Sequence, residues 1–148
     1  FGVSITVGIS TTVENYSSFA KAYEEARTAI TIGKKKGTRE ICFIEDLRME
    51  EAFYEMSKMD TFRKLAENTL GILEEHDKKH GTCYLETLQV LTENQGARKE
   101  TAETLYLHRN TLAYRIRQIE QLTGYCLNDP QTLFQVQLAV KIYTYMNL

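Results

Sequence analysis

The sequence predicts an α+β fold that is mainly helical, with a partial β-α-β piece first and a C-terminal helical bundle after it. Three observations lead to this fold class. Apolar residues alternate with small or polar ones from Val3 to Ile9, which is typical of a strand. A second short run of this kind occupies residues 40–44, and from Leu47 onward the apolar residues follow only helical spacings.

The first 46 residues are expected to form strand, helix and strand. Between the two strands, apolar residues recur at helical spacing from Ser17 to Ile32. Gly33 and Gly37 bracket three lysines, where this helix is expected to end. Two strands and a helix normally need further strands to bury both faces of a sheet. Residues 1–46 are therefore interpreted as the end of a larger α/β domain, in a piece of a longer protein.

The remaining chain is expected to be a series of helices. Asp60 is predicted to cap the second of them, and Gly81 marks a break after a charged run. The predicted helices are 48–59, a segment that follows Asp60 and extends to the charged run 74–80, and then 84–93, 99–105, 109–123 and 131–146. Domain boundaries follow at 1–46, at 47–80 for a helical connector, and at 81–148. The last helix is apolar nearly all round, so it is expected to be buried in its own domain or against another subunit.

Composition excludes several classes of protein. With 148 residues, 43% of them hydrophobic, the chain has the apolar side chains for a core. No run approaches the roughly 18 apolar residues that span a bilayer. Three distant cysteines and three histidines fit neither a disulfide framework nor zinc-ligand spacing. We therefore expect a cytoplasmic protein with no metal, cofactor or membrane partner, in which the cysteines are small apolar fillers.

Two short helices, 99–105 and 109–123, are joined by a tight turn and carry the functional signal. The second helix is amphipathic, with an apolar stripe of Leu112, Ile116, Ile119 and Thr123 facing opposite to Asn110, Tyr114, Arg117 and Gln121. Such a helix is typical of a recognition helix, in which Arg reads guanine and Asn reads adenine in the major groove of DNA. The alternative is that these polar side chains only solvate the helix.

Positive charge is concentrated in the same place. Residues 98–117 hold five Lys or Arg against two Glu, a balance of +3, whereas residues 81–148 hold six of each sign. Local charge matters for phosphate neutralisation more than the total does. Arg115 and Arg117 are expected to reach phosphates, together with Lys99 and Thr101 near the start of the preceding helix.

The stretch from Leu107 to Gly124, with its His-Arg-Asn-Thr-Leu core, resembles the C-terminal helix-turn-helix of the PucR/CdaR-like bacterial transcriptional regulators. The resemblance covers most of residues 82–143. It implies a Fis-type helix-turn-helix, operator binding as a homodimer, no catalysis, and control of a catabolic operon of the purine or sugar-diacid type. The effector is expected to be bound by a region outside this chain.

The resemblance also places His108 and Thr111 at signature positions. The predicted base contacts are Arg109, Asn110 and Tyr114. The predicted phosphate contacts are Lys99, Thr101, His108, Thr111, Arg115 and Arg117. A side-chain cap of the recognition helix is an alternative role for His108. Tyr106 stands where many helix-turn-helix proteins have glycine, and a left-handed tyrosine costs on the order of 1 kcal/mol, so a looser turn is expected.

The stretch from Val3 to Gly37 resembles the last part of the degenerate GGDEF-like domain that precedes this helix-turn-helix in the same family. The catalytic turn of an active nucleotide cyclase is absent from the sequence, so no enzyme is expected. Two other functions were weighed: a cyclase remnant, and a helical protein–protein interaction module without DNA affinity. For the homodimer, the last helix and the helices between 48 and 80 are both candidate interfaces.

Overall fold

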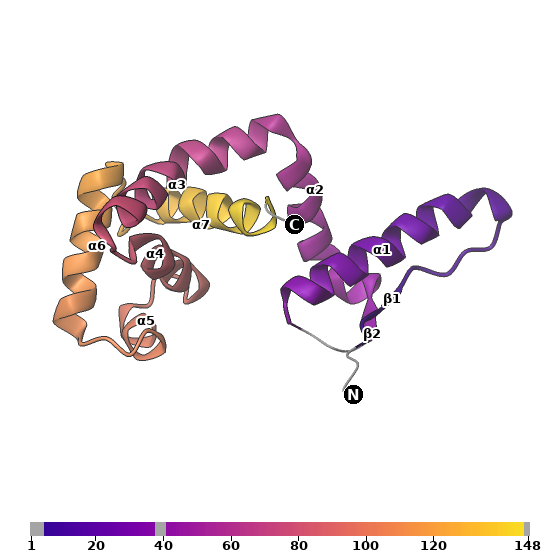
Figure 1. The fold of residues 1–148 in the computed structure, drawn as a ribbon, viewed down its shortest axis with the longest axis horizontal. Coiled ribbons are helices and arrows are strands. Elements are labelled where there is room, and N and C mark those ends of the chain that lie inside the picture. Colours follow the sequence, from indigo (N-terminus) through magenta and orange to yellow (C-terminus); the bar gives the residue numbers. More distant parts are fainter. Residues whose placement is uncertain (1–4, 38–40, 147–148) are drawn as a thin grey trace. The chain divides into compact units, whose positions relative to one another are not determined.

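The computed structural model describes residues 5–37 and 41–146, most of which are helical (Figure 1). Two compact units divide the chain: residues 1–58 with 145–148 form the first, and residues 59–144 form the second. Val3 and Glu40, at the outer ends of the two predicted strands, lie outside the described residues. No helix in the described ranges is both long enough and apolar enough to cross a membrane.

The first unit begins with a parallel β-α-β arrangement, which confirms the predicted order of strand, helix and strand. Strands β1 (Val7–Ile9) and β2 (Ile41–Phe43) pair in parallel, with Gly8 opposite Cys42. Helix α1 (Phe19–Lys35) runs between them after a 3-10 turn η1 (Tyr16–Ser18). It continues through Gly33, where the sequence suggested an end, and stops before Gly37, which has a φ of 70°. The turn η2 (Ile44–Leu47) and helix α2 (Arg48–Lys58) complete the unit.

Strand β1 approaches α1 through Gly8. A Cβ atom at Gly8 would lie 2.1 Å from the main-chain oxygen of Ala26, so only glycine fits there. The alternation of the strand then turns Val7 away from the helix, and Val7 is 44% exposed. The small core of the unit forms on the helix side from Ala29, Cys42 and Ile44, with Leu47 packed against it.

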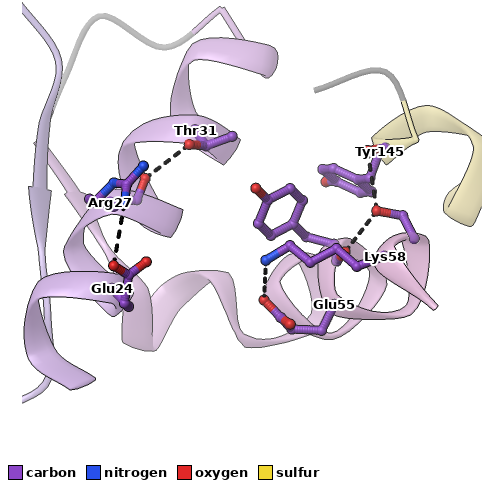
Figure 2. A network of polar contacts seen from close by, with 8 residues as sticks. Glu24, Arg27, Thr31, Glu55, Lys58 and Tyr145 are labelled. Atoms are coloured by element: carbon purple, nitrogen blue, oxygen red, sulfur yellow. Dashed lines mark hydrogen bonds and ion pairs between the residues drawn. The ribbon is translucent and has the colours of Figure 1, made fainter. Parts of the chain in front are cut away.

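Polar contacts order the surface of α1 and the end of α2 (Figure 2). On α2, the ammonium group of Lys58 lies 3.9 Å from the ring centroid of Tyr54 and bonds the Glu55 carboxylate at 2.7 Å. The buried hydroxyl of Ser57 donates to the main-chain oxygens of Tyr54 and Tyr145, at 2.7 and 3.2 Å. These contacts tie Tyr145 to α2 within the first unit.

The second unit consists of five helices whose bounds agree with the predicted ones to within one residue. They are α3 (Asp60–His80), α4 (Tyr84–Glu93), α5 (Arg98–Thr104), α6 (Arg109–Thr123) and α7 (Pro130–Tyr145), the last of which ends in the first unit. The prediction that Asp60 caps α3 is wrong. Met59 is the N-cap residue, and Asp60 is the first helical residue, where its charge complements the positive end of the helix dipole.

One apolar cluster holds the second unit together. Helix α4 packs on α6, and α3 packs on both. Helix α7 adds Val136 and Val140 to this cluster, so on this side its apolar surface is buried within its own unit, whereas Phe134 is 63% exposed. The buried members of the cluster are Leu70, Leu73, Tyr84, Leu88, Leu91, Ala102, Leu112, Ile116, Ile119, Leu127, Val136 and Val140.

Cys83 and Cys126 are exposed, so the prediction of apolar fillers is wrong for them.

The links between these helices are tight. The Asp77 carboxylate accepts hydrogen bonds from the main-chain N–H groups of Tyr84 and Leu85, both at 2.9 Å, and so caps α4. Between α5 and α6, Tyr106 adopts a left-handed conformation with a φ of 53°. The N–H of Leu107 then bonds the Ala102 oxygen at 2.8 Å, closing the end of α5. The expectation of a looser turn is therefore wrong, because Tyr106 adopts the left-handed conformation and the turn stays closed.

Candidate nucleic-acid interface

Helix α6 begins at a side-chain cap. His108 is the N-cap residue, and its Nδ1 accepts a hydrogen bond from the N–H of Asn110 at 3.3 Å. This confirms the capping role considered for His108. Because its partner is an N–H donor, Nδ1 is the unprotonated nitrogen, and in the neutral ring the proton resides on Nε2. An exposed donor therefore stands beside the first turn of α6.

The two faces of α6 are those that the helical spacing predicts. Leu112, Ile116 and Ile119 are at most 2% exposed and lie in the core. On the other side, Asn110 and Arg117 are exposed, and Tyr114 is 52% exposed. Thr123 is half-buried, and its hydroxyl donates to the Ile119 oxygen at 2.7 Å. The polar face of α6 is thus accessible from solvent within the second unit.

A hollow of about 890 Å³ lies between α5 and α6. It brings three predicted contact residues together: Lys99 from α5, and Arg109 and Asn110 from the first turn of α6. Arg98 and the strained Tyr106 also line it, and the ring of Tyr106 is 96% exposed. The hollow therefore combines exposed cations and an exposed aromatic ring with one exposed acid, Glu103.

Thr101 does not belong to this surface. Its side chain is fully buried, and its hydroxyl donates to the main-chain oxygen of Ala97 at 2.7 Å. This corrects the prediction that Thr101 contacts phosphate. Lys99 and Thr111 are exposed, by contrast, and the N–H of Thr111 bonds the His108 oxygen at 2.9 Å.

Two residues of α4 that sequence reasoning missed interact with the flank of α6. The Thr87 hydroxyl, fully buried, accepts a hydrogen bond from the guanidinium of Arg115 at 3.0 Å. Burial of Tyr84, together with its interaction with Tyr114 of α6, raises the pKa of Tyr84. Both α4 residues follow helical spacing and looked like ordinary core positions. Arg115 is half-buried as a result, whereas Arg117 folds back onto its own helix, with Nε 3.4 Å from the Ala113 oxygen.

Carboxylates do not neutralise the cations of this region. The described ion pairs all join residues between Lys21 and Lys78. In the segment 81–144, which we call the helix-turn-helix segment, Arg98 instead bonds the neutral amide oxygen of Asn128 at 2.8 Å. Two of the acids there bond the fold itself, and Glu120 accepts a hydrogen bond from the N–H of Leu127. Asp129 accepts the hydroxyl and N–H of Thr132, which lower the pKa of its carboxyl.

Metal-ligating side chains are dispersed. Within residues 5–37 and 41–146, no group of three or more His, Cys, Asp or Glu is placed to hold an ion. The rings of His76 and His80 lie 4.4 Å apart, but His76 is engaged by the Thr82 hydroxyl at 2.9 Å and stacks on Tyr84.

Comparison with known proteins agrees with this description. Residues 84–142 match the family of the PucR C-terminal helix-turn-helix domain. No solved structure gives a significant match. The matched segment contains α4, α5 and α6 and most of α7, so it coincides with the part of the chain that carries the cationic surface.

Several curated relatives match nearly the whole chain. The purine catabolism regulatory protein of Bacillus subtilis is 29% identical over 144 residues, which is 96% of this chain and 27% of the relative. The proline-responsive transcriptional activator PutR of the same species is 29% identical over 136 residues, which is 90% of this chain and 33% of the relative. The carbohydrate diacid regulator of Escherichia coli is 27% identical over 123 residues, which is 82% of this chain and 31% of the relative.

The chain thus spans between a quarter and a third of the length of these relatives. Their names describe regulators, and that of PutR describes a transcriptional activator. Residues 84–142 are thus similar to the PucR C-terminal helix-turn-helix domain, and the chain as a whole is similar to part of these regulators.

Proposed function

We propose that this chain is the DNA-reading part of a bacterial transcription regulator, with α6 inserted in the major groove. One observation carries the proposal: the cations of the helix-turn-helix segment have no carboxylate partners among the described residues, and most of them gather around α6 and the hollow beside it. Cations without internal partners are available to neutralise phosphates and release counterions.

In the proposed complex, Arg109, Asn110 and Tyr114 contact bases. Arg109 and Asn110 stand in the exposed first turn of α6, where side chains of a recognition helix reach base edges. Phosphates are contacted by the exposed side chains of Lys99, His108, Thr111 and Arg117, and by the half-buried Arg115. For His108, the Nε2–H that its capping role leaves free is the proposed donor.

Beyond this surface, the similarity to named regulators suggests the wider protein. We propose control of a catabolic operon of the purine or sugar-diacid type, action as a cytoplasmic homodimer, and an effector bound outside this chain. Residues 1–46 are proposed as the end of a GGDEF-like domain without catalytic activity, 47–80 as a helical connector, and 81–148 as the DNA-binding domain.

Salt dependence of duplex binding tests the proposal. The 148-residue chain is titrated against a random-sequence duplex, and against sites selected by it from a random pool, between about 50 and 200 mM KCl. We expect selected sites to bind more tightly, with affinity falling steeply and linearly on a log–log plot. If binding is absent or independent of salt, the alternative of a helical protein-interaction module is favoured and the proposal fails.

A further inference from the structure

The guanidinium of Arg115 is held by a neutral partner. It donates to the Thr87 hydroxyl at 3.0 Å, and Thr87 is fully buried in the middle of α4. The orientation of that hydroxyl is fixed from the other side, because it also donates to the Cys83 oxygen at 2.6 Å. With its one hydrogen used in this way, the oxygen has its lone pairs available for the arginine.

A neutral anchor has a different effect from a carboxylate. A carboxylate would hold the arginine but cancel most of its positive charge toward a third partner. The threonine hydroxyl restricts the side chain while leaving the whole charge in place, together with the guanidinium donors that Thr87 does not use. Immobilising a long side chain before binding reduces the entropy that is lost on binding.

We propose that Thr87 of α4 is a positioning residue for DNA binding, which holds Arg115 of α6 ready to contact a phosphate. This inference rests on the proposed function. Thr87 is completely buried and touches no DNA itself, so it acts only through Arg115.

A double-mutant cycle with the full 148-residue chain tests this role, with a random-sequence duplex as the probe. Thr87→Val removes the hydroxyl but keeps the branched shape, and we expect it to weaken duplex binding by about fivefold. In an Arg115→Gln background, the same Thr87→Val change is expected to have no further effect. Thr87→Ser, which retains the hydroxyl, is expected to bind duplex like the unaltered chain.

Thr92→Val is the matched control, because Thr92 is a buried threonine of the same helix whose hydroxyl bonds only the Gln89 oxygen. It is expected to leave affinity unchanged. Thermal melts confirm that each variant is folded, and Thr87→Ala replaces the valine variant if that one does not fold. Equal losses from Thr87→Val with and without Arg115, or equal losses from Thr87→Val and Thr92→Val, would overturn the inference. Failure of the unaltered chain to bind duplex would instead overturn the proposed function.

Discussion

The chain treats its positive charges in two different ways on either side of Gly81. Up to that residue, six of the described lysines and arginines pair with nearby carboxylates, as in Lys58 with Glu55 and Lys78 with Glu74, both at 2.7 Å. Beyond it, in the helix-turn-helix segment, Arg98 and Arg115 bond an amide and a hydroxyl. Both regions expose cations, but ion pairs with carboxylates occur only in the first of them among the described residues.

This difference between the two regions concerns the binding of a charged partner more than the stability of the fold. Exposed ion pairs contribute only about 0–1 kcal/mol each, so the helix-turn-helix segment loses little by lacking them. What it gains is positive charge that is not already neutralised when a polyanion arrives. The location of ion pairs in this fold therefore indicates which surface is free for a charged partner.

The strongest test of the comparison removes charge from each region in turn. We expect the triple variant Lys99→Gln, Arg115→Gln and Arg117→Gln to lower the slope of log affinity against log salt by about 3, since each phosphate contact contributes roughly 0.9. The matched variant is Lys21→Gln, Arg27→Gln and Lys58→Gln, whose cations are all paired with carboxylates. It is expected to keep the original slope in the same titration, and an equal fall in both variants would remove the distinction between the regions.

Base reading is the next largest expected effect. Arg109→Ala or Asn110→Ala is expected to weaken binding to a selected site by roughly 1–3 kcal/mol each, with a smaller change on a random duplex. Arg117→Ala, as a phosphate contact, is expected to weaken both probes alike. Competition titrations with the two duplexes measure the difference. If Arg109→Ala left the preference for the selected site over the random duplex unchanged, Arg109 would be assigned to a phosphate contact instead.

The first unit contains a buried carboxylate, Glu25, whose removal is expected to change stability but not duplex binding. Glu25 accepts the Thr11 hydroxyl at 2.6 Å and its N–H at 3.0 Å, and these bonds lower its pKa from 4.5. Its stabilising effect is thus present above the unfolded-state pKa and is lost as pH falls through the lowered value. We expect Glu25→Gln to destabilise the chain by about 2 kcal/mol near neutral pH.

In urea titrations, this difference between Glu25→Gln and the unaltered chain is expected to shrink as the pH falls below 4.5. Duplex affinity at neutral pH is expected to stay unchanged. A Glu25→Gln variant with weakened duplex binding would show that the first unit takes part in recognition.

The smallest expected effect concerns strain. Among the described residues, both non-glycine residues with positive φ, Gln95 and Tyr106, belong to the second unit. Tyr106→Gly is expected to raise the free energy of unfolding by ~0.5–1 kcal/mol, because the left-handed strain is relieved and an almost fully exposed ring loses no packing. It is also expected to weaken duplex binding about twofold, because a gain in stability at a functional surface is commonly accompanied by a loss of function. A gain in both quantities would mean that the ring has no role at the hollow.

The helix limits could be predicted because they depend on local signals. Gly81 and Gly124 end α3 and α6 in left-handed conformations, and periodic apolar residues define the helices between such breaks. The burial of threonines was harder, since the residue type fits both the surface and the core. Thr101 lies four residues before Leu105, which packs against the core. Helical spacing therefore places the Thr101 side chain on the inward face as well.

Contacts between elements were beyond sequence reasoning. Nothing local to Thr87 reveals that an arginine 28 positions later reaches it, because the pairing depends on how α4 and α6 pack. For the first strand, alternation was correctly recognised, but the side that meets α1 is the one bearing Gly8 and not the one bearing the large apolar residues. Alternation along a strand shows which residues share a side, but it does not determine which side a helix covers.

The close approach at Gly8 has a genetic consequence. The atom that would obstruct a side chain there is the main-chain oxygen of Ala26, which no substitution at Ala26 removes. A damaging replacement of Gly8 is therefore not repaired by trimming the neighbouring residue. Suppressors would have to arise where α1 as a whole can move, and true reversion to glycine would dominate any selection for recovered folding.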